Sequence, residues 1–322
     1  MTLLVLVIVA TAIAVAVAML VLRWPRAAGR AAPPAVGAAR KAGAAIRRHP
    51  GRGSGLAARL DPEAATGLAL TLALVVTVGG GVLLGVLAYL VRGNNDLVRL
   101  DNSVANWGDR HASPFSTDGL EAITHLGEPF VVAVLAAVLA LIETLRTRSP
   151  WVLPFLLIVV AGNGILTTSV KNLADRVRPA LNPVAETLGP SFPSGHSSWS
   201  AAFFAAAALL LSRDRSRRAR AVIAGIAAGL AVAVAGSRVL LGVHWLSDVL
   251  AGLALGSAWF AICAIAFGGR LLRFGAAAEE AVRVAKGGVG AAHPQASSTG
   301  TVSGDSRQSA GTSAAAASSR EP

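Results

Sequence analysis

The chain has 322 residues, of which 54% are hydrophobic and 14% are charged, against about 25% charged residues in soluble domains. This balance and a mean hydropathy of +0.60 argue against an ordinary soluble protein and indicate several membrane spans. The net charge of +12 does not indicate a nucleic-acid partner, because the basic residues lie between apolar runs without interleaved aromatic residues or a recognised nucleic-acid motif. Anionic lipid and membrane topology account for them better.

Seven apolar runs, most near the roughly 20 residues that a spanning helix needs, predict an all-α polytopic membrane helix bundle. In chain order they occupy residues 2–22, 67–92, 129–145, 150–169, 197–212, 219–236 and 245–267. The fifth run is short but can begin a residue or two earlier. The last run holds the single cysteine, Cys263, which excludes a disulfide within the chain and a cysteine-based metal site.

The first run has two readings, a secretory signal peptide or a transmembrane anchor. It lacks a basic n-region, and its apolar stretch exceeds the roughly 7–15 residues usual for a signal peptide. We therefore expect residues 1–22 to form an uncleaved N-terminal transmembrane anchor.

The basic residues predict the topology. With the N-terminus outside, 22 of the 29 Lys and Arg residues lie on the cytoplasmic side, as the positive-inside rule requires. The short segment 213–218, which carries four arginines, is the strongest cytoplasmic marker. A cleaved signal peptide would invert this arrangement.

The remaining segments divide the chain further. Residues 23–66 are expected to be a basic cytoplasmic linker that touches anionic headgroups, and residues 93–128 a polar outer loop. Residues 67–267 form the six-helix core, one helix fewer than the full bundle. The tail, 268–322, has few large apolar side chains beyond residue 286 and is expected to be cytoplasmic and largely disordered.

The segment KNLADRVRP begins at Lys171, near the end of the fourth run. Arg178 follows seven residues later, close to two helical turns, so a continuing helix would place both cations on one face. Pro179 biases Arg178 towards extended backbone and ends that helix. Arg178 can hold a phosphate through its planar fork, and Lys171 adds a point charge. Arg176 fits an ordinary snorkelling charge, and Asp175 a partner for Lys171.

The segment Pro193-Ser194-Gly195-His196 leads into the fifth run. Pro193 and Gly195 predict a turn, and Ser194 is a good helix N-cap. A helix N-terminus offers free N–H groups to an anion, and Gly195 permits close backbone approach. A protonated His196 there could donate its proton to a leaving alkoxide; the alternative is an interfacial histidine on a plain helix cap.

The segment SRVLLGVHWLSD joins the last two runs. Arg238 lies just past the sixth run, and His244 and Asp248 are four residues apart, which places them on one helix face. A carboxylate that accepts from one imidazole nitrogen fixes the tautomer and leaves the other nitrogen free to attack. The alternative is a structural His–Asp hydrogen bond at a helix start.

Taken together, the three segments favour a functional site over three separate structural features. Under one topology, all their candidate site residues lie at the outer ends of the fourth to seventh runs. Polar groups are costly inside a membrane, so their presence there is a functional hypothesis by default. They predict a site for a phosphate group presented by a lipid. The chain has no HExxH or clustered-carboxylate motif, so no metal is expected, and three cations can stabilise the charge instead.

The segments resemble the three-part signature of the type 2 phosphatidic acid phosphatase superfamily, K-x6-RP, PSGH and SR-x5-H-x3-D, with every spacing matched. The resemblance covers about residues 67–267, and Asp101, Trp107 and the stretch 123–127 (ITHLG) are similar to the family's weaker early pattern. It implies that His244 forms a phosphohistidine, that Asp248 orients it, and that His196 protonates the leaving group and then activates water. It also implies a phosphate site formed by Lys171, Arg178, Ser194, Gly195 and Arg238, without a metal or other cofactor.

We therefore expect an integral membrane phosphatase that acts on lipid phosphate mono- or diphosphate esters at the outer leaflet of the cell membrane. Undecaprenyl diphosphate, phosphatidic acid and phosphatidylglycerophosphate are candidate substrates, and the first is favoured because the site is expected to face outwards. The alternatives are a lipid headgroup phosphotransferase, a vanadium-dependent haloperoxidase and a non-catalytic membrane scaffold or transporter. The sequence is compatible with a homo-oligomer.

Other histidines and tryptophans fall outside the signature. His49, His111, His125 and His293 are expected at solvent-exposed or interfacial positions. Most tryptophans are expected to be membrane-interface anchors, with Trp199 and Trp245 as candidates for substrate contact.

Overall fold

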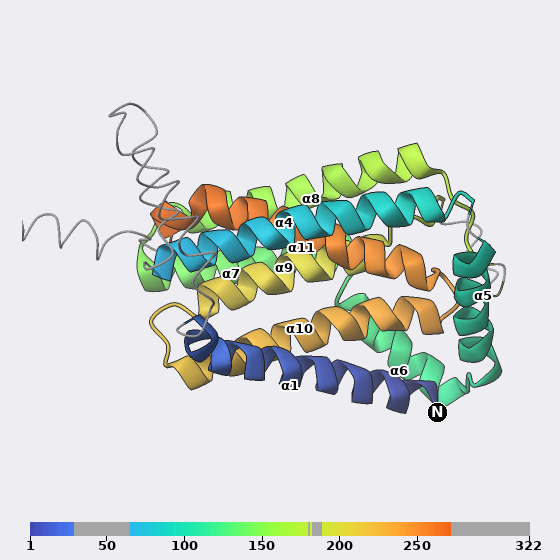
Figure 1. Ribbon diagram of the computed structural model, residues 1–322. Helices are drawn as coiled ribbons and strands as arrows, with labels where there is room; N and C mark the ends of the chain where they lie inside the picture. Colours follow the sequence, from blue (N-terminus) through green and yellow to red (C-terminus); the bar gives the residue numbers. More distant parts are fainter. Residues whose placement is uncertain (29–64, 94, 180, 182–188, 272–322) are drawn as a thin grey trace, which may run out of the picture. The chain divides into compact units, whose positions relative to one another are not determined.

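The computed structural model describes residues 1–28, 65–93, 95–179, 181 and 189–271. Within these ranges the chain forms nine α-helices and no strand (Figure 1), which confirms the predicted all-α bundle. The helices are α1 (Thr2–Ala28), α4 (Ala65–Leu90), α5 (Asn95–Arg110), α6 (Pro114–His125), α7 (Pro129–Thr147), α8 (Val152–Ala174), α9 (Gly195–Leu211), α10 (Arg217–Leu240) and α11 (Leu246–Leu271).

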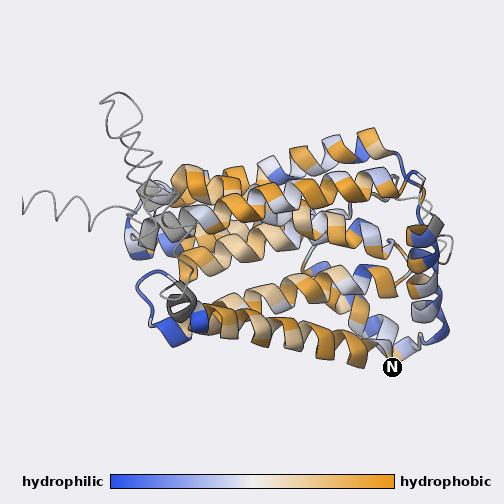
Figure 2. Ribbon diagram, in the orientation of Figure 1, coloured by the Kyte–Doolittle hydropathy of each residue, from blue (hydrophilic) through white to orange (hydrophobic). Residues whose placement is uncertain are grey.

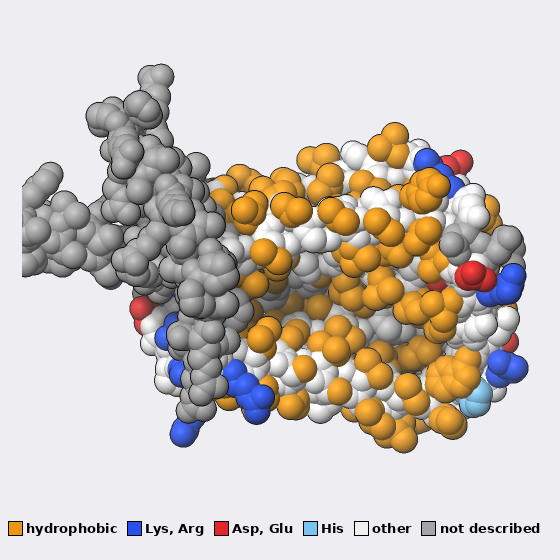
Figure 3. Space-filling view, viewed as in Figure 1, with side chains coloured by type: hydrophobic (Ala, Val, Ile, Leu, Met, Phe, Trp, Pro, Cys, Tyr) orange, Lys and Arg blue, Asp and Glu red, His pale blue; other side chains and the backbone are white. Residues whose placement is uncertain are grey.

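Six helices, α1, α4, α7, α8, α10 and α11, are long and apolar enough to cross a membrane. Helix α9 is apolar but shorter, with 17 residues, as the short fifth run indicated. Hydrophobic residues follow the helices along their length (Figure 2), and the visible face of the bundle is covered by hydrophobic side chains, with charged ones gathered towards its ends (Figure 3). The multi-pass membrane architecture predicted from the sequence is confirmed.

The segment 93–128, which we expected to be a polar outer loop, is mostly helical where the structure describes it. Helix α5 has Asp96 in its first turn and Arg110 in its last, both of which complement the helix dipole. Helix α6 begins with a capping box, in which Ser113 Oγ accepts from the Ser116 N–H at 3.3 Å and Ser116 Oγ accepts from the Ser113 N–H at 2.9 Å. In Figure 1, α5 lies across one end of the bundle, and it contacts α10 and α11.

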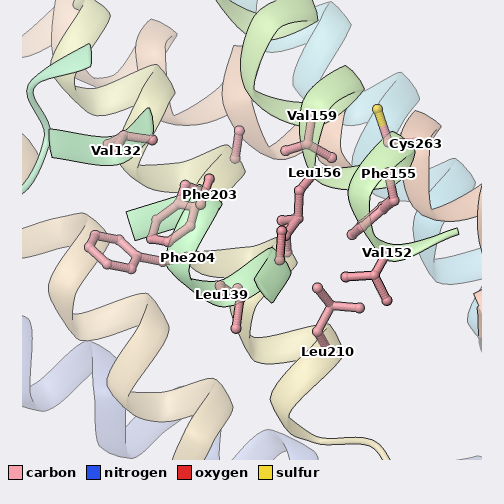
Figure 4. Packing of buried hydrophobic residues seen from close by; sticks show 14 of the residues in the cluster. Val132, Leu139, Val152, Phe155, Leu156, Val159, Phe203, Phe204, Leu210 and Cys263 are labelled. Carbon is pink, nitrogen blue, oxygen red and sulfur yellow. The ribbon is translucent and has the colours of Figure 1, made fainter. Parts of the chain in front are cut away.

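The main hydrophobic core joins α7, α8, α9, α10 and α11 (Figure 4). Its most buried side chains include Val152 and Phe155 early in α8 and Leu210 at the end of α9, all 0% exposed. These positions are far along their helices from Lys171 and His196. Two smaller hydrophobic clusters, around Phe192 and around Val239, lie nearer the signature segments.

Two glycines on α11 bring α9 close to it. A Cβ atom on Gly252 or Gly256 would collide with the backbone oxygen of Ser194 or Ser198. Small residues permit such close helix contact in membranes, where packing and hydrogen bonds drive association. The contact places the start of α9 beside the start of α11.

Helix α1 packs along α10 through small residues. A Cβ atom on Gly225 would lie 2.6 Å from the carbonyl oxygen of Ala14, and one on Gly229 would lie 3.0 Å from the Ala14 Cβ. Leu6, which is 4% exposed, fills the space beside Gly236. The choice of an uncleaved anchor over a signal peptide stays a prediction, and most of the expected 23–66 linker and 268–322 tail lies outside the described residues.

Candidate active site

The first signature segment turns sharply after α8. The helix ends at Ala174, and Asp175 adopts the left-handed conformation with φ 43°, which aspartate tolerates better than most residues. Our expectation that one helix carries both Lys171 and Arg178 is therefore wrong. Lys171 Nζ donates to the carbonyl of Pro190 at 2.6 Å rather than to Asp175, and Arg178 Nε donates to the carbonyl of Gly189 at 2.8 Å.

The second segment starts α9 beside α11. Ser194 is the N-cap residue, and its backbone N–H donates to the carbonyl of Asp248 at 2.9 Å. Its hydroxyl is buried and accepts from Ser197 Oγ at 3.0 Å, so it makes no side-chain cap. Gly195 and His196, the next two residues, open onto a cavity.

The third segment places His244 between α10 and α11. Its Nδ1 lies 3.4 Å from Asp248 Oδ2, and its Nε2 lies 3.0 Å from Arg178 Nη1. Because a guanidinium can only donate, Nε2 carries the lone pair and the proton belongs on Nδ1, towards the carboxylate. The backbone N–H of Trp245 also donates to Asp248 Oδ2, at 3.0 Å.

These segments meet at one cavity of about 730 Å³. Six of the eight predicted site residues line it: Lys171, Arg178, Gly195, His196, Arg238 and His244. Asp248 and Ser194 are 0% exposed and lie outside its lining. Three cations and two imidazoles therefore face a common space large enough for a ligand.

One side of the cavity is apolar and follows α8 away from the polar end. Ala161, Ile165 and Trp199 line it, together with Pro129 at the start of α7. A Cβ atom on Gly164 would lie 2.7 Å from Trp199 Cζ2, so the glycine makes room for the indole ring. Of the two tryptophans singled out for substrate contact, Trp199 thus lies on the cavity wall.

Arg238 is 8% exposed and is held from α6. Its Nη1 donates to Thr124 Oγ1 at 3.1 Å, whereas its Nε has no hydrogen-bond partner among the described residues. Leaving a buried donor unpaired is costly, and an anion in the cavity would supply an acceptor. Gly127, which belongs to the same early pattern as Thr124, lets the stretch 123–127 lie close to His196. A Cβ atom at this glycine would lie 3.1 Å from the carbonyl oxygen of His196.

Arg176 is the residue that the sequence reasoning missed. We expected a snorkelling charge, but its side chain is only 13% exposed and bridges two carboxylates. Nη2 lies 2.8 Å from Asp101 Oδ2 and Nη1 lies 2.6 Å from Asp248 Oδ1. Trp245 packs over the guanidinium at 5.5 Å and does not appear among the residues that line the cavity. Asp101 was the available signal for this role of Arg176, because a buried carboxylate needs a cationic partner.

The remaining described histidines lie outside the cavity lining. His111 stacks on Trp107 with 4.7 Å between ring centroids, and its Nδ1 lies 2.8 Å from the Trp107 carbonyl oxygen. His125 is exposed and pairs with Glu128 at 2.6 Å. His49 and His293 lie outside the described residues.

Burial sets the protonation state of the candidate nucleophile. It lowers the pKa of His244 to about 4, with Asp248 opposing the shift and Arg178 and Arg238 adding to it. Burial also lowers the pKa of Arg178, against the effect of Asp248, but arginine remains charged in proteins. At neutral pH the cavity therefore presents a neutral His244 beside a charged Arg178.

This protonation state predicts the acid side of the pH profile. A histidine with a lowered pKa is neutral above that value and gains its proton only below it, so the neutral form of His244 persists down to about pH 4. The pH dependence of kcat/KM reports the pKa values of the free enzyme. We therefore expect kcat/KM to decrease on the acid side with an apparent pKa near 4, set by protonation of His244. Initial rates between pH 3 and 8, with refolding controls at each pH, measure it; a limb near pH 6.5 would contradict it.

The fold and the cavity define a multi-pass membrane protein with a cavity lined by three cationic side chains and two imidazoles. Residues 151–271 match the PAP2 superfamily. Phosphatidylglycerophosphatase B of Bacillus subtilis is 32% identical over 148 residues, which cover 44% of this chain and 71% of that protein. Together these similarities show that the chain belongs to the PAP2 superfamily, as its signature segments predicted.

Other relatives have different names. The lipid A 1-phosphatase of Rhizobium johnstonii is 36% identical over 137 residues, 38% of this chain and 52% of that protein, so the chain matches about half of that relative's length. The decaprenylphosphoryl-5-phosphoribose phosphatase of Mycobacterium tuberculosis is 33% identical over 157 residues, 46% of this chain and 78% of that protein. A crystal structure of a transmembrane PAP2 type phosphatidylglycerolphosphate phosphatase from Bacillus subtilis aligns with a TM-score of 0.54 and 27% identity, covering 59% of this chain and 94% of that one.

Proposed function

We propose that this protein is an integral membrane lipid phosphatase that hydrolyses phosphate esters of lipids through a phosphohistidine. The observation that carries the proposal is the shared cavity, which Lys171, Arg178 and Arg238 line together with the imidazoles of His196 and His244. Arginine forks and a lysine point charge suit the oxygens of a phosphoryl group. The buried, unpaired Nε of Arg238 is a further donor for such an oxygen.

The chemistry follows from the two histidines. His244 Nε2 attacks phosphorus, a P–N bond forms, and the P–O bond to the lipid alcohol breaks. His196 gives its proton to the departing oxygen, and the bound phosphate dianion favours the protonated imidazole that this step needs. His196 then takes a proton from water, which attacks the phosphohistidine; the P–N bond breaks and inorganic phosphate leaves. The cations stabilise the charge on the equatorial oxygens in both steps.

The shape of the cavity supports a lipid substrate. Its apolar side reaches Ala161, ten residues before Lys171 on α8, which corresponds to about 15 Å along a helix. A headgroup phosphate can therefore lie among the cations while the apolar chain lies along α8. The distribution of basic residues supports an outer-leaflet position for this end. Labelling of a cysteine introduced at the exposed Arg99 by an impermeant reagent on intact cells tests that orientation.

A panel of lipid phosphates tests the function. The names of the relatives put phosphatidylglycerophosphate first, followed by phosphatidic acid and undecaprenyl diphosphate, each presented in detergent micelles to the purified full chain. We expect release of inorganic phosphate from at least one of them and much slower release from glycerol phosphate, which lacks the apolar chain. Transfer of the phosphoryl group to a second lipid without free phosphate would indicate a phosphotransferase, and no product from any lipid would contradict the proposal.

We also propose that the reaction needs no metal, because the three cations already supply the charge that a metal provides in other phosphatases. We expect phosphate release to keep its rate after dialysis against EDTA. Addition of Mg²⁺ or Zn²⁺ to the dialysed protein is the matched measurement. A loss of activity that a divalent ion restores would contradict the proposal.

A further inference from the structure

Arg176 lies behind the cavity, at the centre of a buried network that joins three distant parts of the chain. We propose that Arg176 is a positioning residue, which with Asp101 holds the Asp248 carboxylate ionised and directed at His244. The proposal rests on the proposed function, since it assigns a role within the same site. Neither Arg176 nor Asp101 lines the cavity, so each acts through Asp248 rather than on the substrate.

The network is closed by hydrogen bonds at both ends. Arg176 Nη1 donates to Asp248 Oδ1 at 2.6 Å and to Ser247 Oγ at 2.7 Å, while its Nη2 donates to Asp101 Oδ2 at 2.8 Å. Asp101 Oδ1 accepts from the Ser247 N–H at 2.9 Å, and its Oδ2 accepts from the Ser247 hydroxyl. Helix α5 is thereby fixed to the start of α11, and three hydrogen bonds orient the guanidinium.

The arrangement leaves one face of Asp248 for the histidine. Its Oδ1 is occupied by Arg176, while its Oδ2 accepts from the Trp245 N–H at 3.0 Å and lies 3.4 Å from His244 Nδ1. If Oδ1 lost its donor, the carboxylate could rotate or take up a proton, and either change would weaken its hold on the imidazole tautomer. The planar fork of arginine can bridge two carboxylates, which a lysine ammonium cannot do in the same geometry.

The charges of the network are strongly coupled because they are buried. Asp101 and Asp248 are 1% and 0% exposed and share one guanidinium. Removing one partner of a buried ion pair leaves an uncompensated charge. The charged and titratable groups that face the His244–Asp248 pair from the surrounding elements are Lys171, Arg176, Arg178, His196, Arg238 and Asp101.

Opposite pH shifts in two variants provide the test. In Arg176→Gln the loss of a positive charge makes His244 easier to protonate, so the acid limb of kcat/KM moves to higher pH, by about one unit. In Asp101→Asn a negative charge is lost, and Asp248 becomes the single carboxylate that Arg176 pairs with in this network. His244 is then harder to protonate, so the acid limb of kcat/KM moves to lower pH. We expect kcat to fall about 10²-fold in Arg176→Gln, the scale of lost outer partners, with KM changed little. Arg176→Lys should restore the limb more fully than the rate.

Arg99→Gln is the matched control, because Arg99 lies on α5 near Asp101 and its side chain forms an exposed pair with Asp96. It should leave both kcat and the limb unchanged. A limb that stays fixed in Arg176→Gln and Asp101→Asn, or moves the same way in both, overturns the proposal, as does a rise in KM at unchanged kcat. If Arg176→Gln fails to fold, Asp101→Asn and Arg176→Lys decide the matter by the same criteria.

A second readout needs no substrate and separates this proposal from the proposed function. Diethyl pyrocarbonate acylates neutral imidazole, so the pH dependence of His244 modification, followed by mass spectrometry, reports its protonation directly. The same opposite shifts are expected there. If the wild type hydrolyses a lipid phosphate but the pH dependence of His244 modification is the same in both variants as in the wild type, only the role of Arg176 is contradicted. If the pH dependence shifts as expected but no lipid phosphate is hydrolysed, only the proposed function is contradicted.

Discussion

Replacing His244 with alanine should reduce turnover by at least about 10⁴-fold, a loss typical of removing a nucleophile that acts as part of a unit. The reason is geometric, because His244 Nε2 carries the lone pair proposed to attack phosphorus and lies beside Arg178 in the cavity. His196, the other imidazole of the cavity, is assigned to proton transfer. Single-turnover phosphate release from a lipid that the wild type hydrolyses is the measurement, with the acid-labile phosphate bound to each protein counted in parallel.

His111→Ala is the control for this substitution. His111 lies on α5, stacks on Trp107 and does not line the cavity, so its removal should leave turnover within about twofold, as most changes away from a site do. Phosphate release by His244→Ala at the rate of the control would remove His244 from the nucleophile role and return the question to His196.

Asp248→Asn should lower kcat by about 10³- to 10⁴-fold, the scale found when the orienting carboxylate of a triad is replaced by an amide. The amide can present an N–H to His244 Nδ1, which favours the wrong tautomer and takes the lone pair away from Nε2. It also breaks the ion pair with Arg176 at 2.6 Å. Steady-state kcat and KM on the same lipid measure the effect.

Asp96→Asn is matched to this change, since the same carboxyl is removed from an exposed pair, 88% exposed at the aspartate. We expect wild-type kcat in that variant. Equal rates in the two asparagine variants would show that the carboxylate of Asp248 does not orient the nucleophile.

The bundle could be predicted from the sequence because lipid selects for long apolar helices. Each apolar run coincides with one helix of the structure to within two residues wherever it extends past a helix end, including the short fifth run at α9. Helices α5 and α6 escaped prediction because their polar composition resembled a loop, although the Ser113-Pro114 start of α6 is a recognisable helix signal. Amphipathic periodicity in α5 was the other available sign.

The site was predictable where spacing alone fixes it and not where distant residues meet. Lys171 and Arg178 both line the cavity, although the chain reaches it through a turn at Asp175 rather than along one helix. Arg176 was misread because its partners lie 75 residues before it and 72 residues after it. Pairing over such separations depends on the packing of α5 against α11, which no local pattern reveals.

The contact between α1 and α10 has a consequence for the helix that carries Arg238. The stretch that matches the family, 151–271, contains α10 but not the helix that covers its glycines. Without α1, Gly225 and Gly229 would face lipid as a shallow trough along the very helix that carries Arg238. The N-terminal helix thus supports the helix that carries Arg238 from outside the stretch that matches the family.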